Sequence, residues 1–307
     1  MRETPTCTMK HILNSVKDLL VYTAFVVRGG WSNPGSQSRR EARRKLIRQF
    51  PRWYRNRLRS GGPQIHALPW ITYDAIDFLD ALLTRSMTVF EYGSGGSTLW
   101  LSMRVGQLYS VEHEKTWGQR VRRELAERSI GNCHLQCVLP VPLPDGEDGP
   151  DPMDPMQYGT MDKALARYQF KAYVASIDVH PAGHFDVILL DGRCRPAGVW
   201  HAIPKLRAGG YLILDNSDRD NYARGIALLD GWPRWDFAGF APWVGALITK
   251  TSFYRKPNGP AGRCVIPTQG QHREEAHPLA VRPRPSLLCG DPGHETGTPR
   301  PARAAIQ

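Results

Sequence analysis

The feature that most constrains the fold of this chain is the stretch from Val89 to Thr98, which reads VFEYGSGGST. An apolar run ends in an acidic residue, Glu91, and a glycine-rich turn then leads into a helix that we expect to begin near Ser97. Glycine lets the backbone turn sharply and come close to a ligand. The start of a helix attracts a carboxylate or a phosphate group. The stretch therefore predicts a strand, a tight loop and a helix that together hold a small charged ligand.

A second acidic residue supports a nucleoside ligand. Glu112 ends the next apolar run, 107–111, and lies 21 positions after Glu91. In a βαβ unit, an acid at about this distance faces the ribose of a bound nucleoside. A dinucleotide-binding loop has the pattern G-x-G-x-x-G, but the third glycine position here is Thr98. Of the nucleoside ligands that this loop could hold, a nicotinamide dinucleotide is therefore the weaker candidate.

The pattern E-x-G-x-G at Glu91–Gly95 resembles the first motif of class I S-adenosylmethionine-dependent methyltransferases. Glu112 is similar to the acid of that family's second strand, which holds the ribose hydroxyls. The resemblance covers residues 67–255, and its later motifs lie at 185–192, 206–216, 234–240 and 246–254. It implies S-adenosyl-L-methionine as the cofactor. The cofactor-binding residues that it implies are Glu91, Tyr92, Gly93, Ser94, Gly95, Gly96, Ser97, Glu112, His113 and Asp191.

The order of apolar runs and turns indicates an α/β fold, because strands that alternate with helices form a parallel sheet with helices on both faces. The resemblance adds a terminal antiparallel hairpin. We predict a Rossmann-like, doubly wound, mostly parallel seven-stranded sheet with a C-terminal antiparallel hairpin and a helical N-terminal extension. The expected elements are helix 70–83, strand 87–92, helix 97–104, strand 107–112, helix 115–128, strand 133–138, a loop insertion at 139–160, helix 161–177, and strands that end at Asp191 and Asp215.

Composition divides the 307 residues into three parts. Residues 1–60 are predicted to form a basic, helical N-terminal extension, and 61–255 the catalytic domain. Residues 256–307 contain no aromatic residue and are dense in proline and glycine. Such a segment cannot bury enough apolar area to offset its chain entropy, so we predict a disordered tail.

The carboxyl ends of parallel strands meet at one edge of the sheet, so Glu91, Glu112, Asp191 and Asp215 are expected to converge there. Asp191 and Asp215, with the neighbouring Asn216, offer three oxygen ligands for a hard cation. They resemble the magnesium ligands of catechol- and caffeoyl-type O-methyltransferases, which implies a Mg²⁺ site. The alternative is that Asp191 contacts the cofactor or substrate and that Asp215 and Asn216 cap a following helix.

Two residues are candidates for the base that takes a proton from the acceptor. Asp191 lies at the predicted strand edge, and His201 follows on the next helix, where an imidazole titrates near neutral pH. A structural role for His201 is the stronger interpretation. Arg193 and Arg195 are candidates for holding an anionic substrate, and Trp70 and Tyr73 for lining the pocket.

The segment 39–59 contains ten lysine or arginine residues and one acid, Glu41, a net charge of +9. Phe50, Trp53 and Tyr54 lie among these basic residues. The segment is expected to bind RNA by charge and stacking, or an anionic membrane surface by charge, or to be only a solvated helix face.

These patterns together predict methyl transfer to an oxygen of a small molecule or glycan. The Asn/Asp-Pro-Pro-aromatic motif of nucleobase amino-methylation is absent, because the fourth-strand motif reads Leu190-Asp191-Gly192-Arg193. The alternatives are an RNA-directed methyltransferase and a non-catalytic cofactor-binding protein of the same fold. The six cysteines show no zinc spacing, and no apolar run approaches the roughly 20 residues that span a bilayer. We therefore expect a cytoplasmic protein, peripheral to the membrane if 39–59 binds lipid.

Overall fold

The computed structural model describes residues 39–59, 65–242 and 248–258, together with the single residues Val16, Leu20 and Thr23. They belong to a compact unit that ends at Ile266. No helix among them is long and apolar enough to cross a membrane. Most of the predicted tail, from residue 259 onward, lies outside the described residues, as does most of the chain before Arg39.

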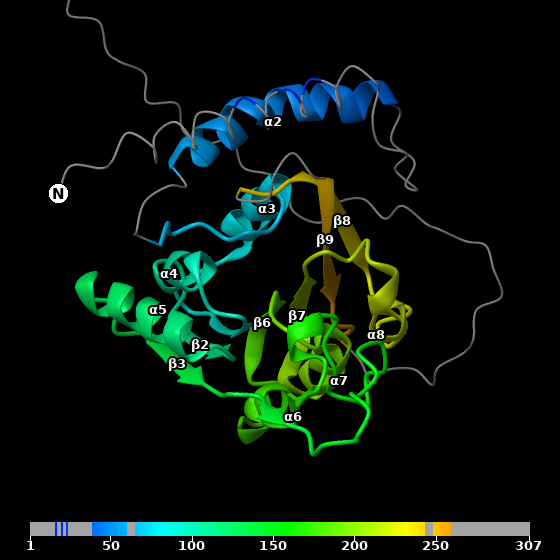
Figure 1. The fold of residues 1–307 in the computed structure, drawn as a ribbon. Helices are drawn as coiled ribbons and strands as arrows, with labels where there is room; N and C mark the ends of the chain where they lie inside the picture. The colour runs from blue at the N-terminus through cyan, green and yellow to red at the C-terminus, as the bar shows by residue number, and fades with distance from the viewer. Residues whose placement is uncertain are drawn as a thin grey trace, which may run out of the picture. The chain divides into compact units, whose positions relative to one another are not determined.

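A seven-stranded sheet forms the centre of the unit (Figure 1). Its strands are β1 Thr88–Tyr92, β2 Gln107–Glu112, β3 Cys133–Cys137, β6 Phe185–Leu190, β7 Leu206–Leu214, β8 Arg234–Phe240 and β9 Ile248–Arg255. They lie in the spatial order β3-β2-β1-β6-β7-β9-β8. The first five of these pair in parallel, whereas β9 runs antiparallel to β7 and β8 antiparallel to β9. The predicted fold class, a mostly parallel sheet with a terminal antiparallel hairpin, is confirmed.

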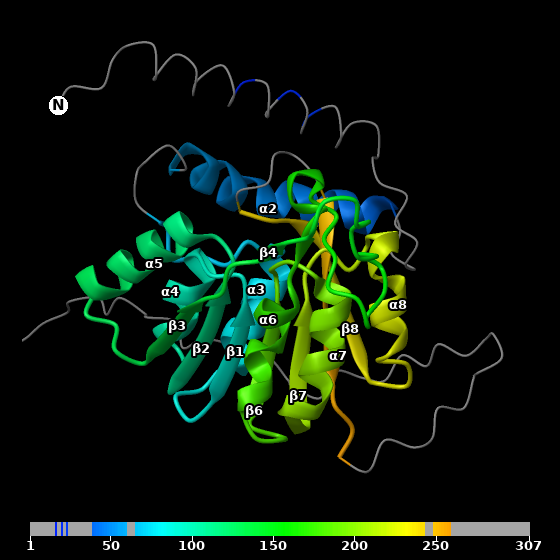
Figure 2. The ribbon, with the colours of Figure 1, turned by 60° about the horizontal axis from the view of Figure 1, so that its bottom comes forward.

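Helices cover both faces of the sheet (Figure 2). They are α2 Arg39–Arg59, α3 Tyr73–Leu82, α4 Gly96–Ser102, α5 Lys115–Glu127, α6 Lys171–Val174, α7 Arg195–Lys205 and α8 Ala223–Ala227, with short 3₁₀ turns at Lys163–Leu165, Ala175–Val179 and Asp220–Tyr222. Successive residues of a strand point to opposite faces, so each strand supplies two cores. Val89 of β1 packs in the core under α2, α3 and α4, whereas Phe90 packs in the core under α6 and α7.

The helix α2 is anchored to the sheet by one of its faces. Trp53 is fully buried and packs on Phe240 of β8, with 5.5 Å between the ring centroids. Gln49 is also buried. Its side-chain amide donates to Asp74 of α3 at 2.8 Å and accepts from the backbone N–H of Phe240 at 3.3 Å. The basic segment 39–59 is therefore a helix packed on the domain.

The insertion after β3 differs from its predicted structure. The expected helix 161–177 is interrupted by strand β5, Tyr168–Gln169, which pairs with β4, Val141–Pro142. The chain is helical again only from Lys171, after Phe170 has been buried in the core. A short antiparallel strand pair, β4 with β5, therefore takes the place of the first half of the helix.

Candidate active site

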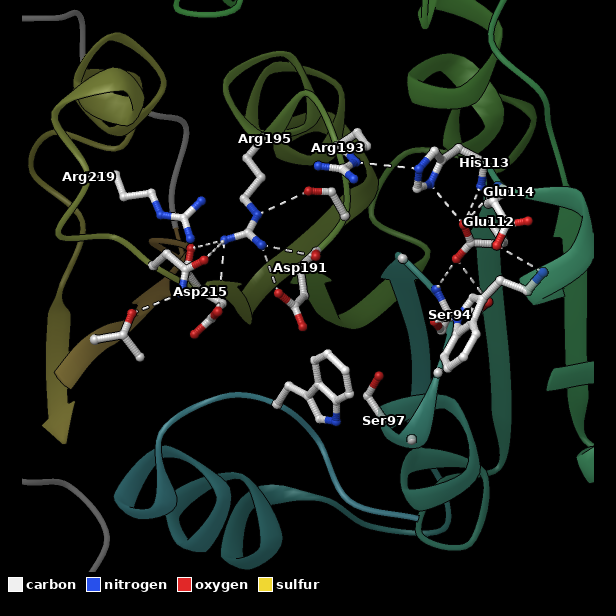
Figure 3. Close-up of a pocket in the computed structure, with 18 of the residues that line it drawn as sticks. Ser94, Ser97, Glu112, His113, Glu114, Asp191, Arg193, Arg195, Asp215 and Arg219 are labelled. Carbon is white, nitrogen blue, oxygen red and sulfur yellow. Dashed lines mark hydrogen bonds and ion pairs between the residues drawn. The ribbon is translucent and has the colours of Figure 1, made fainter. Parts of the chain in front are cut away.

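A cavity of about 730 Å³ opens at the carboxyl ends of β1, β2, β6 and β7 (Figure 3). This is the edge at which a doubly wound sheet binds its ligands. The cavity is lined by Trp70, Gly93, Ser94, Gly95, Gly96, Ser97, Glu112, His113, Glu114, Trp117, Asp191, Gly192, Arg193, Arg195, Asp215, Asn216, Asp218, Arg219, Ile248 and Thr249. The structure thus brings the predicted loop and three of the four predicted acids into one cavity.

The glycine loop is confined on both sides. Gly93 has φ +88°, and a Cβ built on it would lie 2.8 Å from the Cα of Gly192, in the segment that follows β6. A Cβ on Gly96 would lie 2.2 Å from the carbonyl oxygen of His66. Real side chains do not fit at such distances, so both positions require glycine. The loop is clamped between the segment before α3 and the end of β6.

Glu91 braces this loop from beneath and does not line the cavity. Its side chain is fully buried, and Oε2 accepts hydrogen bonds from the hydroxyls of Thr98 at 2.6 Å and Ser110 at 2.7 Å. Burial raises the pKa of Glu91 to about 7, although the bonds from the nearby hydroxyls oppose the rise. The expectation that Glu91 contacts a cofactor is corrected, because its carboxylate is buried beneath the loop and does not line the cavity.

Tyr92 is also placed away from the cavity. Its ring is buried in the core under α6, and its hydroxyl donates to the carbonyl of Val174 at 2.7 Å. The next residue along β1 therefore points to the opposite face from Glu91, as the alternation of a strand requires. Neither side chain is available to a ligand in this cavity.

Glu112 connects the end of β2 to the glycine loop. Its Oε2 accepts from the backbone N–H of Ser94 at 3.0 Å and from the Ser94 hydroxyl at 3.1 Å, and Oε1 accepts from the N–H groups of His113 and Glu114 at 2.8 and 2.9 Å. Burial acts to raise the pKa of Glu112, but the His113 imidazole and the backbone N–H groups of Glu114 and His113 outweigh it, so the net pKa is lowered. Glu112 is thus an ionised carboxylate at the cavity wall.

Two lining residues near Glu112 were missed by sequence reasoning. The indole Nε1–H of Trp117 donates to the carbonyl of Ser94 at 2.8 Å, and its ring lies beside Gly95. Glu114 caps the first turn of α5, accepting from the N–H groups of Thr116 and Trp117. The sequence carried a signal for both residues, because Glu114 stands where an acidic side chain can cap α5 and Trp117 follows in the first turn of that helix.

Arg195 lies at the centre of the other half of the cavity (Figure 3). It begins α7, and its side chain is only 8% exposed. The guanidinium donates to the Asp191 carboxylate at 2.8 Å, to the backbone carbonyl of Asp215 at 2.5 Å and to Oδ1 of Asn216 at 3.0 Å. It also bonds the backbone carbonyls of Asp191 and Gly192. One side chain therefore ties together the ends of β6 and β7.

Burial and the neighbouring charges change the pKa values of Asp191, Asp215 and Arg195. Burial raises the pKa of Asp215 to about 7, helped by the nearby Asp191 carboxylate and opposed by Arg195. Burial also raises the pKa of Asp191, against the effect of Arg195. Burial of the guanidinium acts to lower the pKa of Arg195, but Asp191, Tyr222 and Asp215 outweigh it, so the net pKa is raised.

The predicted metal site is corrected. Asp191, Asp215 and Asn216 do converge, but the guanidinium of Arg195 lies among their oxygens where the cation was expected. Asp215 is also engaged by the Thr251 hydroxyl at 2.7 Å, and the Asn216 amide donates to Thr249 at 2.8 Å. Within the described part of the chain, no group of three or more His, Cys, Asp or Glu residues is arranged to hold a metal ion.

His201 lies outside the cavity. Its Nδ1 is 2.8 Å from the carboxylate of Asp178, in the 3₁₀ turn after α6, and its Nε2 is 3.3 Å from the hydroxyl of Tyr158, in the insertion. The hypothesis that His201 is the catalytic base is corrected, since its ring contacts Asp178 and Tyr158 and does not line the cavity. Asp191 remains the candidate base at the cavity.

The remaining candidates divide between cavity and core. Trp70 lines the cavity and is 50% exposed, whereas Tyr73 is buried in the core. Arg193 lies at the cavity but is paired with Asp162 at 2.9 Å. Arg219 was not singled out by the sequence. It is an exposed base at the same wall, and its side chain donates to the Tyr222 hydroxyl at 3.3 Å.

No protein-family model matches this chain, and no curated protein is similar to it. Several solved structures are similar to part of this chain at low sequence identity. A methyltransferase-like protein from Silicibacter pomeroyi is 19% identical over 64% of this chain and 92% of its own, with a TM-score of 0.42. The O-methyltransferase TomG from Streptomyces achromogenes, solved with S-adenosylmethionine, is 16% identical over 59% and 77%, with a TM-score of 0.40.

The YcgJ protein from Bacillus subtilis is 13% identical, with a TM-score of 0.30, and the match spans 46% of this chain and about half (48%) of that one. The class that the structure defines, a Rossmann-like α/β protein with a terminal antiparallel hairpin, rests on the strand order.

Proposed function

We propose that this protein is an S-adenosylmethionine-dependent methyltransferase that acts on an oxygen of a small molecule or glycan. The observation that carries the proposal is a cavity in which the glycine loop and Glu112 form one wall and Asp191 and Asp215 another. Its volume of about 730 Å³ lies within the roughly 300–1,000 Å³ typical of small-ligand sites. A cavity with these two walls suits a nucleoside cofactor together with part of an acceptor.

The cofactor half fits a nucleoside with an amino-acid appendage. The backbone of Gly93 and Gly95 and the hydroxyl of Ser97 are the groups that would hold the methionyl end. Glu112 would hold the ribose hydroxyls. Its two oxygens already accept four hydrogen bonds, but the one from the Ser94 hydroxyl is released when that side chain rotates. A ribose hydroxyl would take that place.

The acceptor half supplies positioning and a proton acceptor. When bound, the cofactor supplies an activated methyl group. The side chain of Asp191 is 19% exposed, against 4% for Asp215, so Asp191 is the carboxylate that an acceptor hydroxyl reaches. We assign to it the orientation of that hydroxyl and the acceptance of its proton. Arg195 holds this carboxylate in place and carries the positive charge that the metal hypothesis assigned to Mg²⁺.

Calorimetry with S-adenosylmethionine and with NAD tests the cofactor. We expect binding of the former alone. Glu112→Gln should weaken it by about 2–3 kcal/mol, because the replacement loses charge-assisted hydrogen bonds. Ser94→Ala should leave the affinity unchanged or higher, since it removes the competing hydroxyl. Glu127→Gln, on the exposed side of α5, is the matched control. Binding of NAD alone, or wild-type affinity in a folded Glu112→Gln variant, contradicts the assignment.

A methyl-transfer screen against hydroxylated acceptors tests the reaction. Asp191→Asn should bind S-adenosylmethionine but lose transfer, and transfer should persist in excess chelator because Arg195 supplies the fixed charge. Loss of transfer in chelator, restored by Mg²⁺, would return the metal to the mechanism. Binding without transfer to any acceptor would favour a non-catalytic cofactor-binding protein, and transfer to RNA alone would favour the RNA-directed alternative.

A further inference from the structure

The outer face of α2 is a basic surface with no assigned role. We define this outer face by Arg44, Ile47, Arg48, Pro51 and Arg55, all of which are exposed. Their spacing of three and four residues places them on one side of the helix. Arg48 approaches Asp74 only to 3.9 Å, and its side chain is 77% exposed. Within the described part of the chain, Arg44 and Arg55 form no ion pair.

The opposite face of α2 packs on the domain and thereby determines the orientation of the outer face. Lys45 is paired with Asp74 at 2.5 Å, and Arg52 with Asp77 at 2.8 Å, so these two bases are neutralised by α3. The burial of Trp53 prevents rotation of the helix about its axis without loss of the core contact. The outer face is therefore turned away from α3, and its arginines are exposed.

The aromatic residues decide between the two partners that the sequence suggested. Binding of single-stranded RNA without sequence preference uses exposed aromatic rings on which bases stack. Here Trp53 is fully buried, and Phe50 stacks on Tyr54 with 5.5 Å between ring centroids while both pack against the same core. Trp53 lies on the buried face, and Phe50 and Tyr54 are partly buried against the core, so the described helix offers charge without a fully exposed ring for stacking.

The outer face instead combines positive charge with exposed apolar groups. Ile47 is 53% exposed between Arg44 and Arg48, and Pro51 is exposed beside them. Two further apolar residues described nearer the N-terminus, Val16 and Leu20, are 49% and 65% exposed. Arginines interspersed with exposed apolar side chains match the interface of an anionic bilayer, where phosphate groups lie next to acyl chains.

We propose that the outer face of α2 docks the protein on a membrane surface rich in anionic phospholipid. The three arginines contact lipid phosphates, and Ile47 and Pro51 lie at the boundary between headgroups and acyl chains. The helix lies along the surface and does not cross it. This inference stands on α2 alone and is independent of the reaction proposed for the cavity.

Co-sedimentation of the full chain with lipid vesicles tests the proposal. The probe is phosphatidylcholine vesicles with and without about 30 mol% phosphatidylglycerol, at about 0.05 M and about 0.5 M salt. Binding should require the anionic lipid and fall steeply with salt. The triple variant Arg44→Gln, Arg48→Gln, Arg55→Gln should bind on the order of 100-fold more weakly, since each base contributes about fivefold. Ile47→Ser should weaken binding at unchanged charge.

The matched control removes three exposed bases elsewhere, by Arg85→Gln, Arg123→Gln and Lys171→Gln. It has the same net charge as the triple variant and should bind like the unmodified protein. Melting temperatures of both triples should match that of the unmodified protein, because all six residues are exposed. Equal losses in the two triples, or vesicle binding by the outer-face triple at full strength, overturn the proposal. So does binding to single-stranded RNA with none to anionic vesicles.

Discussion

Glu91 is a carboxyl group buried directly under the loop that lines the cavity. One of its oxygens accepts two hydroxyl hydrogen bonds, and the other, Oε1, has no partner. Burial raises its pKa from 4.5 to about 7. A group in this position changes its charge near neutral pH while it supports Thr98 at the start of α4, so the loop's stability is linked to pH.

The substitution Glu91→Gln tests this link. Because the folded pKa is raised, the stabilising contribution is fully present below about pH 4.5 and is lost as pH rises through about 7. We expect this group to lower the unfolding free energy by about 2–3 kcal/mol between pH 5 and 8, and the glutamine variant to lack that decrease. Urea titrations across this range measure it, with Glu127→Gln as control. Parallel pH profiles for the unmodified protein and Glu91→Gln would refute the assignment.

The convergence of the acids could be predicted, whereas their roles could not. Glu112, Asp191 and Asp215 each end an apolar run, and parallel strands bring such ends to one edge. The placement of Arg195 depends on how far a long side chain at the start of α7 reaches back over two strands. Sequence spacing does not encode that reach, so the space among the carboxylates was assigned to a metal ion.

The strand–loop–helix element around Gly93 is specified by two separate requirements. Its φ of +88° disfavours any side chain, and the Cα of Gly192 lies 2.8 Å from where a Cβ would be. Gly146, in the insertion, has the same φ but nothing within 4 Å of its Cβ position. A side chain at Gly146 would therefore meet backbone strain alone, whereas one at Gly93 would meet both backbone strain and steric crowding.

Alanine substitutions at the two positions should differ accordingly. Gly146→Ala should lower the unfolding free energy by about 1 kcal/mol, the cost of a left-handed residue with a Cβ. Gly93→Ala should lower it by about 2–4 kcal/mol, because crowding against β6 adds to that strain. Chemical denaturation measures both. Equal effects would mean that the loop moves away from Gly192 at little cost.

Elements formed by long patterned runs were predictable, and the insertion was not. The apolar run 107–112 matches β2 in full, because alternation and flanking turns define it locally. The helix expected at 161–177 failed because Val141 pairs with Gln169 across a long loop, and Phe170 is drawn into the core. Such pairing depends on distant residues and overrides local helical preference.

Taken as a whole, the molecule uses α2 as part of its core. Trp53 is among the largest fully buried side chains and packs with Phe240 at the end of β8. The sequence placed the first boundary at residue 60, because charge dominates the composition of 39–59. Ten basic residues dominate the composition of this segment although one face of the helix is buried. Composition alone therefore could not assign α2 to the core.

Removal of the indole tests whether α2 and the sheet unfold together. Trp53→Ala should lower the unfolding free energy by about 3–5 kcal/mol, the usual cost of emptying a buried aromatic site. Ile47→Ala, on the outer face of the same helix, should change it by less than about 0.5 kcal/mol. Thermal and urea unfolding measure both. A small effect at Trp53 would mean that α2 detaches without loss of the sheet.

The guanidinium of Arg195 also determines how the cleft responds to its surroundings. A bound divalent ion exchanges with solution, so the charge of a metal-dependent cleft follows the free ion concentration. A guanidinium is attached to the chain and stays protonated at any physiological pH. The positive charge between β6 and β7 is therefore present in every copy of the folded protein. It is unaffected by metal starvation and cannot be replaced by a competing ion.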